Sequence, residues 1–167
     1  MDEAGFGRIS EPSSCWCPEG VRPVVPCHRV REYMYAFGAI EPLTGDKFFI
    51  ISPKCNTAWT SEFLRLLSEK YSKDYLLIAT DCASWHKSKS LIIPDNIILH
   101  YLPPYTPEMN PIEQIWKEVR KDGFKNTLFK SLNDVVDKLS DSLMSLSNDV
   151  VRSISARAWI VEMLNQK

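Results

Sequence analysis

Residues 102–113 read Leu102-Pro103-Pro104-Tyr105-Thr106-Pro107-Glu108-Met109-Asn110-Pro111-Ile112-Glu113 and lead through closely spaced prolines into a predicted helix. Asn110 is a good N-cap, Pro111 suits the first helical position, and Glu113 then completes a capping-box-like pattern. Capping alone would account for Glu113. It does not account for the preceding prolines, which restrict the backbone and favour a rigid approach that aims the Glu113 carboxylate at a fixed point.

Two further carboxylates are candidates to meet Glu113. Asp81 follows the hydrophobic run of residues 75–80, which predicts a buried strand that ends there. A simpler interpretation makes Asp81 only the cap of a following helix. Asp2 stands next to the amino terminus, where a residue is normally frayed and exposed. Carboxylates on separate elements can hold Mg²⁺, and a metal pair activates the attacking water and stabilises the leaving oxygen in phosphoryl chemistry.

The composition is that of one globular domain. The chain has 167 residues, of which 44% are hydrophobic, enough for one core followed by a helical tail. No run approaches the roughly 20 apolar residues of a membrane span. Met1-Asp2-Glu3 is unlike the start of a signal peptide, so we expect a cytoplasmic protein that makes no membrane contact.

The charge is nearly balanced, with 20 lysines and arginines against 21 acids, so the chain as a whole does not attract nucleic acid. Basic residues nevertheless follow the candidate acids along the sequence, and they are Lys87, Lys89, Lys117, Arg120 and Lys121. These residues form either solvated helix faces or a local surface for DNA.

The hydrophobic pattern and the turn residues predict the order of the elements. We expect a loop over residues 8–28, an antiparallel hairpin of residues 33–37 and 47–51, a helix over residues 57–71 with Asn56 or Thr57 as N-cap, a short polar helix over residues 84–90, a buried strand over residues 97–101, a helix that opens at Pro111, and packing helices beyond Gly123. This order indicates an α/β or α+β sheet covered by helices.

The five cysteines are scattered, which favours reduced thiols over a disulfide framework. Cys15, Cys17, Cys27 and His28 offer four zinc ligands within a short span. Their spacing lacks the usual Cys-x-x-Cys pair, so zinc is the less favoured interpretation of this segment.

Several stretches together resemble the catalytic domain of the DDE superfamily of transposases, in the bacterial insertion-sequence branch of the mariner superfamily. Asp2-Glu3 looks like the first Asp-Glu pair of that family, and residues 16–23 resemble its Trp-x-Pro-x-Gly-x-x-Pro segment. Residues 81–86 resemble the second-aspartate motif, which has a histidine shortly after the aspartate. Residues 102–117 are the most specific match, and the resemblance covers residues 2–130.

The resemblance implies a ribonuclease-H-like mixed sheet flanked by helices, with a catalytic core over residues 1–130 and a helical tail over residues 131–167 that packs on it. It implies that Asp2, Asp81 and Glu113 bind two Mg²⁺ or Mn²⁺ ions. The reaction would be cleavage and joining of double-stranded DNA at element ends and target, and the resemblance implies that a homodimer carries it out. His86 and the basic residues would contact nucleic acid, no small-molecule substrate is implied, and the protein would associate with the nucleoid when bound to DNA.

Two positions depart from the family pattern. Cys82 stands where the family usually has asparagine, so a hydrogen bond from that amide beside Asp81 is lost or weakened. Only Met1 precedes Asp2. We therefore expect the first central strand to be largely missing, Asp2 to be poorly anchored, and the chain to be an N-terminally truncated transposase.

Two other functions remain open from the sequence. One is an inactive transposase remnant that only binds DNA or a partner protein, and the expected missing strand favours it. The other is a small nuclease or resolvase that acts without integration, which shares the carboxylates but does not account for the proline-rich segment. We expect the transposase catalytic domain.

Overall fold

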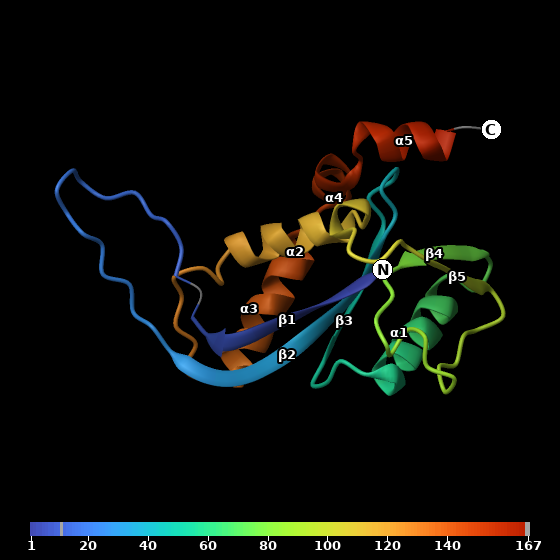
Figure 1. Cartoon of the computed structure of the whole chain (residues 1–167), viewed down its shortest axis with the longest axis horizontal. Coiled ribbons are helices and arrows are strands. Elements are labelled where there is room, and N and C mark those ends of the chain that lie inside the picture. Colours follow the sequence, from blue (N-terminus) through green and yellow to red (C-terminus); the bar gives the residue numbers. More distant parts are fainter. Residues whose placement is uncertain (11, 166–167) are drawn as a thin grey trace.

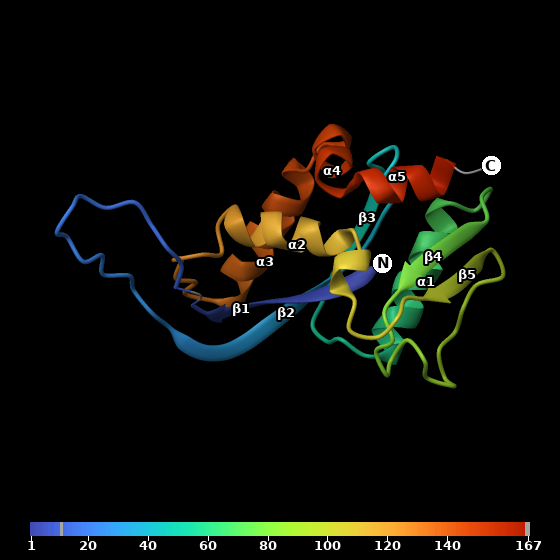
Figure 2. The ribbon, with the colours of Figure 1, turned by 45° about the horizontal axis from the view of Figure 1, so that its top comes forward.

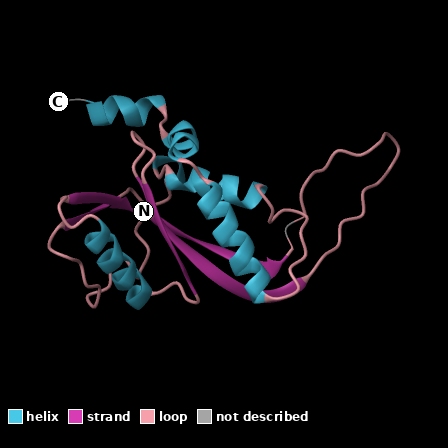
Figure 3. Ribbon diagram, turned by 180° about the vertical axis from the view of Figure 1, so that it is seen from behind, coloured by secondary structure: helices cyan, strands magenta, loops and turns pink. Residues whose placement is uncertain are grey.

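The computed structural model describes residues 1–10 and 12–165, which form a mixed α/β fold (Figure 1). In chain order the elements are β1 (Asp2–Ile9), β2 (Arg29–Ile40), β3 (Lys47–Ser52), α1 (Thr57–Lys70), β4 (Leu76–Thr80), β5 (Ile97–Tyr101), the 3₁₀ turn η1 (Pro107–Met109), α2 (Ile112–Lys121), α3 (Leu132–Ser145), α4 (Asn148–Ser155) and α5 (Ala158–Asn165). Figure 3 shows α3 lying across the sheet. The predicted class, a sheet flanked by helices, is confirmed.

The first strand begins at the first candidate carboxylate. β1 runs from Asp2 to Ile9 and pairs antiparallel with β2, with Asp2 opposite Gly38. The expectation that this strand is largely missing and leaves Asp2 unanchored was therefore wrong. That expectation followed from the single residue that precedes Asp2, whereas the strand runs forward from Asp2. Glu3, Gly5 and Gly7 alternate with its buried side chains, and these residue types are depleted in strands, so the hydrophobic pattern did not reveal it. Gly7 is required there, because a Cβ atom would lie 2.5 Å from the ring of Tyr33.

Two strand ladders meet at the start of β1. β1, β2 and β3 form an antiparallel sheet in that order, which confirms the predicted hairpin. β4 and β5 form a parallel pair. The backbone nitrogen of Met1 donates to the carbonyl oxygen of Ala79 in β4 at 2.8 Å, and Figure 2 shows the amino terminus beside β4. The beginning of β1 and the end of β4 are therefore neighbours, which brings Asp2 and Asp81 to one edge.

Alternate side chains of the sheet face two separate hydrophobic cores, as expected for a strand period of two. One core joins the sheet to α2 and α3, and its members include Phe6, Ala36, Trp116, Val135 and Leu139. The other core joins the sheet to α1, β4 and β5, and its members include Phe37, Phe63, Leu64, Ile78 and Ile97. The sheet is thus covered on both faces, and both α2 and β4 are fixed against it.

Some local predictions need correction. Residues 84–90 form turns and bends, not the short polar helix. β4 and β5 are only half buried, since Leu77 is 75% exposed and Ile98 is 64% exposed. The predicted loop is present, and residues 12–28 extend away from the body between β1 and β2 (Figure 1). Asn56 caps α1 as predicted, because its Oδ1 accepts a hydrogen bond from the Trp59 nitrogen at 3.0 Å.

Within residues 1–10 and 12–165, none of the helices combines the length and the apolar character that crossing a bilayer requires.

The β2–β3 turn is held against α4 by a glycine. Gly45 has a φ of +75°, and a Cβ atom there would lie 1.9 Å from the carbonyl oxygen of Asn148. We expect Gly45→Ala to lower the free energy of unfolding by about 3 kcal/mol, from backbone strain plus overpacking. Gly20 is the matched control, since its φ is +79° but nothing lies within 4 Å of its Cβ position.

We expect Gly20→Ala to lower the free energy of unfolding by only about 1 kcal/mol, the cost of left-handed backbone alone. Urea denaturation of both variants measures the difference. Equal losses in the two variants would show that the contact between the turn and α4 does not constrain the fold.

Candidate active site

Three candidate carboxylates line one cavity. The cavity has a volume of about 400 Å³, and Asp2, Asp81 and Glu113 all contribute to its wall. They come from the start of β1, the residue after β4 and the first turn of α2. Residues 102–107 and Cys82 form much of the remaining wall. The proline-rich approach and the strand end thus bring together acids that are far apart in sequence.

Asp2 is buried and held in place. Asp2 as a whole residue is 8% exposed, and the indole nitrogen of Trp116 in α2 donates to Asp2 Oδ2 at 2.9 Å. Burial above all, and then the charges of Glu113 and Glu3, raise the pKa of Asp2 to about 7. The expectation of a frayed, exposed Asp2 was wrong, because β1 and Trp116 enclose it.

Asp81 begins a tight turn after β4. Its Oδ1 accepts a hydrogen bond from the backbone nitrogen of Ala83 at 3.0 Å and lies 2.7 Å from Nδ1 of His86. The side chain of Asp81 is 54% exposed. The alternative in which Asp81 caps a following helix was wrong, since turns follow it in the structure. Asp81 therefore has one oxygen held by the protein while its side chain remains open to solvent.

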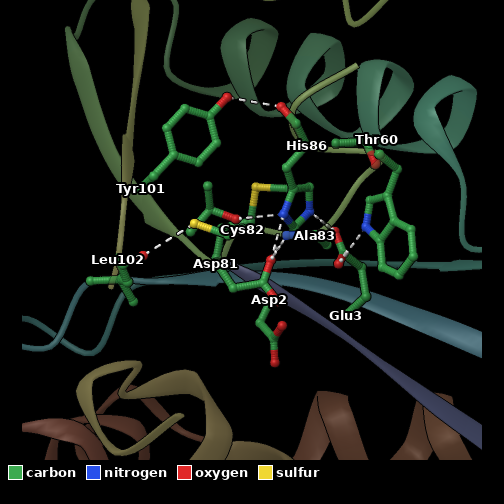
Figure 4. A network of polar contacts seen from close by, with 12 residues as sticks. Asp2, Glu3, Thr60, Asp81, Cys82, Ala83, His86, Tyr101 and Leu102 are labelled. Carbon is green, nitrogen blue, oxygen red and sulfur yellow. Dashed lines mark hydrogen bonds and ion pairs between the residues drawn. The ribbon is translucent and has the colours of Figure 1, made fainter. Parts of the chain in front are cut away.

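His86 connects Asp81 to a second, buried acid (Figure 4). Its Nε2 lies 2.8 Å from Oε1 of Glu3, and the indole nitrogen of Trp85 donates to Oε2 of Glu3 at 3.2 Å. The hydroxyl of Thr80 lies 3.1 Å from His86 Nδ1. Burial by itself lowers the pKa of His86, but the hydrogen bonds and charges of Glu3 and Asp81 raise it overall above its ordinary value.

The same network places His86 in the interior. Its side chain is 0% exposed, and the hydroxyl of Tyr101 donates to its backbone oxygen at 2.8 Å. Sequence reasoning proposed contact with nucleic acid for His86, whereas the structure engages both of its ring nitrogens with protein carboxylates. Glu3 was noted only as part of the Asp-Glu pair, because no local signal reveals a partner 83 positions away.

The approach to Glu113 differs in detail from the capping pattern. The side-chain nitrogen of Asn110 donates to the carbonyl oxygen of Met1 at 3.0 Å, and α2 begins without a side-chain cap. The capping-box interpretation of Glu113 was therefore wrong. The hydroxyl of Thr106 donates to the carbonyl oxygen of Pro103 at 2.6 Å, and Tyr105 between them has a φ of +61°. The approach is a closed turn that docks on Met1 and presents Glu113 to the cavity.

The cavity wall also contains Cys82. Its thiol donates to the carbonyl oxygen of Leu102 at 3.3 Å. This contact ties the turn after β4 to the beginning of the proline-rich segment. The residue at this position therefore bridges two walls of the cavity and is not hydrogen-bonded to Asp81.

The basic residues near the cavity fall into two groups. Lys87, Lys89, Lys117 and Lys121 are exposed. Arg120 is half buried, donates to the carbonyl oxygen of Gly5 at 3.3 Å, and stacks its guanidinium 5.0 Å from the ring centre of Phe6. The four lysines are available at the surface, whereas Arg120 also fastens α2 to β1.

The donor chemistry of the cavity suits a hard divalent cation, which prefers oxygen ligands. Besides three carboxylates, the wall includes Asn110, whose buried side-chain oxygen has no hydrogen-bond partner among the described residues. As the side chains stand, the described part of the chain contains no group of three acidic, histidine or cysteine side chains close enough to hold a metal. The residue types that line the cavity nevertheless fit such an ion.

The cysteine-rich loop offers no comparable arrangement. Cys15, Cys17 and Cys27 are free and exposed. Among residues 1–10 and 12–165, no group of three histidine, cysteine or acidic side chains in this segment is close enough to hold a metal. The zinc interpretation of the loop gains no support from the structure.

Comparison with protein families gives one match over most of the chain. The family model described as DDE superfamily endonuclease matches residues 1–136. A curated relative from Sinorhizobium fredii, described as uncharacterized protein y4pE/y4sA, is 32% identical over 130 residues, which cover 76% of this chain and 96% of that protein.

Solved structures of similar fold come from Mos1 transposase. A pre-cleavage Mos1 transpososome matches with a TM-score of 0.71 at 11% identity, covering 93% of this chain and 50% of that one. A Mos1 paired-end complex with left transposon end matches with a TM-score of 0.69 at 12% identity, over the same shares. A mariner Mos1 paired-end complex with Mg has a TM-score of 0.61 at 14% identity. The chain spans about half the length of these proteins and has their ribonuclease-H-like fold.

Proposed function

This chain belongs to the DDE superfamily of endonucleases, and we propose on that basis that it is a transposase catalytic domain that cleaves and joins DNA strands with divalent metal ions. One observation carries the proposal: three carboxylates from three separate elements line a single cavity of about 400 Å³. Helix capping does not explain why these carboxylates meet. Asp81 accepts a hydrogen bond within a turn and caps no helix, and α2 begins without a side-chain cap, so Glu113 takes part in no capping box.

The metal ligands in this proposal are Asp2, Asp81 and Glu113, and the ions are two Mg²⁺ or Mn²⁺. When bound, such a pair supplies a metal-activated water or hydroxyl and stabilises the leaving oxygen. Structures of the fold-related Mos1 protein with Mn and with Mg support divalent ions as the cofactor. The raised pKa of Asp2 is also consistent with a carboxylate that has a cation for a partner during function.

The protein's own contribution is to hold the ligands in place. β1 and Trp116 fix Asp2, and the turn that docks on Met1 fixes Glu113 at the head of α2. Such a rigid arrangement lowers the entropic cost of aligning DNA and water. We propose that residues 1–130 form the catalytic core and that residues 131–167, which the structure describes as far as residue 165, form the tail.

The proposed substrate is double-stranded DNA, at element ends and at the target. Lys87, Lys89, Lys117 and Lys121 are exposed around the elements that bear the carboxylates and would bind backbone phosphates. The Mos1 structures are complexes with transposon-end DNA and strand-transfer complexes, which supports this class of partner. We propose a homodimer as the working unit, and the paired-end complexes of the fold-related Mos1 transposase support this proposal.

Plasmid nicking tests the proposal. The purified chain should convert supercoiled plasmid to the nicked form in Mg²⁺ or Mn²⁺, and excess EDTA should stop the reaction. Because Ca²⁺ binds oxygen ligands without the strict octahedral geometry of Mg²⁺, it serves as a control that should support DNA binding with much less cleavage. Failure to nick plasmid or short duplexes in any of these ions would contradict the proposal.

A DNA-binding chain without catalytic activity is the second candidate. The observation that favours it is the lack, among the described residues, of three potential ligands already close enough to hold a metal. Retarded migration of duplex DNA without any metal-dependent cleavage would identify this function. Loss of both binding and cleavage would exclude both candidates.

A further inference from the structure

A second acid, outside the three proposed ligands, is connected to the cavity. Glu3 follows Asp2 on β1, so its side chain projects to the opposite face of the strand. Its carboxylate is 3% exposed, and both of its oxygens are engaged, Oε1 with His86 and Oε2 with Trp85. Glu3 therefore cannot serve as an open metal ligand in this arrangement, although it is adjacent to one.

His86 links this buried acid directly to Asp81. Its Nε2 is 2.8 Å from Glu3 Oε1, and its Nδ1 is 2.7 Å from Asp81 Oδ1 (Figure 4). Two carboxylate partners fix both the position and the rotation of the imidazole ring. The ring in turn holds one oxygen of Asp81, together with the backbone nitrogen of Ala83. Oδ2 of Asp81 has none of these contacts.

The linked contacts are buried at Glu3 and His86 and open to solvent at Asp81. The Glu3 side chain is 3% exposed, the His86 side chain 0%, and the Asp81 side chain 54%. A buried acid paired with histidine is weak evidence for stability, because desolvation offsets the attraction between the charges. Its plainer consequence is orientation: a rigid interior support ends on a half-exposed carboxylate at the cavity.

We propose that Glu3 and His86 are positioning residues, which hold Asp81 through Nδ1 of His86 so that its free oxygen faces a divalent cation in the cavity. This inference rests on the proposed function of the cavity. Supporting groups behind a metal ligand fix its orientation, and losing them typically lowers metal affinity 10- to 100-fold. Here the supported ligand is a carboxylate, and the support is a histidine backed by a second carboxylate.

Two substitutions of His86 test the contributions of its two ring nitrogens separately. In His86→Asn the amide nitrogen occupies roughly the place of Nδ1 and can still donate to Asp81. In His86→Gln the amide nitrogen reaches roughly the place of Nε2 and can donate to Glu3 but not to Asp81. Both remove the imidazole ring from the interior, so general damage to the packing there affects both variants.

The measurement is Mn²⁺ affinity of the full chain, by titration with detection of free Mn²⁺ in electron paramagnetic resonance. We expect His86→Gln to lower affinity about 10- to 100-fold and His86→Asn to retain affinity within about fivefold of the original chain. Glu3→Gln keeps the shape and loses the charge, so we expect a loss of about three- to tenfold. The Mn²⁺ concentration for half-maximal plasmid nicking should shift in the same order.

Tyr101→Phe is the matched control. It removes a hydrogen bond to the backbone oxygen of His86 while leaving both ring contacts, and Mn²⁺ affinity should stay within about twofold. Thermal unfolding without metal establishes that each variant is folded, and Glu3→Gln still tests the inference if a His86 variant is not.

The outcomes distinguish this inference from the proposed function. If the original chain binds Mn²⁺ and nicks DNA but His86→Gln binds Mn²⁺ equally well, the positioning role is overturned and the function stands. Equal losses in His86→Gln and His86→Asn would overturn positioning through Nδ1. An original chain that neither binds Mn²⁺ nor nicks DNA would overturn both.

Discussion

Glu113→Gln is expected to reduce metal-dependent DNA cleavage at least about a thousandfold, which corresponds to about 4 kcal/mol of transition-state stabilisation. The substitution keeps the size of the side chain and removes the negative charge of a proposed ligand. Because Glu113 is only partly buried and lies in the first turn of α2, the fold should persist. Asp81→Asn should have an effect of similar size, since it also removes one ligand charge.

Glu108→Gln is the matched control for this prediction. Glu108 belongs to the same approach segment, is exposed, and does not line the cavity. Its replacement should leave the rate of plasmid nicking within about twofold, because an exposed charge outside the site contributes little. Circular dichroism and duplex binding should be unchanged in all three variants. Full cleavage by Glu113→Gln would exclude this carboxylate from the site.

Asp2→Asn should abolish cleavage and at the same time stabilise the metal-free protein at neutral and alkaline pH. Burial raises the pKa of Asp2 from 3.8 to about 7. The folded state therefore holds this proton more tightly than the unfolded state. The contribution of Asp2 to stability falls as the pH rises from about 4 to about 7 and then levels off. Asparagine has no proton to lose, so it avoids this loss.

The free energy of unfolding that Asp2→Asn gains over the original chain is expected to grow with pH. Asp2→Asn and the original chain should differ little near pH 4, and the variant should be more stable by about 4 kcal/mol at pH 8. The amide oxygen can still accept the hydrogen bond from Trp116, so the local packing is kept. Urea denaturation at several pH values with EDTA present measures the difference.

Two controls sharpen this second prediction. Asp122 is an exposed acid whose hydrogen bonds from Ser142 and Lys138 lower its pKa, so Asp122→Asn should not stabilise the protein at pH 8. Added Mg²⁺ should stabilise the original chain more than Asp2→Asn, because only the former offers the full set of carboxylates. A variant that is less stable than the original chain at pH 8 would show that the carboxylate is not a source of strain in the metal-free protein.

Hydrophobic periodicity and turn residues predicted most of the individual helices and strands correctly. The aromatic run of β2, the turn residues before β3 and the amphipathic pattern of α1 each have a clear local cause, and each element is present. β1 was missed because glycines and acids mask a strand that exists only through pairing with β2. The polar turn of residues 84–90 was mistaken for a helix because its order comes from His86 in the interior.

The candidate site likewise has features that the sequence predicts and features that only the tertiary structure reveals. The strand end marked Asp81 and the proline-rich approach to a helix marked Glu113 as candidates, since both are local features of the chain. Asp2 joined them as a predicted ligand through the resemblance to the DDE family. Their meeting in one cavity, the burial of Asp2 under Trp116, and the chain from Glu3 through His86 to Asp81 all required the folded structure. The physical reason is that the pKa and orientation of a side chain depend on neighbours distant in sequence, which only tertiary packing brings within hydrogen-bonding range.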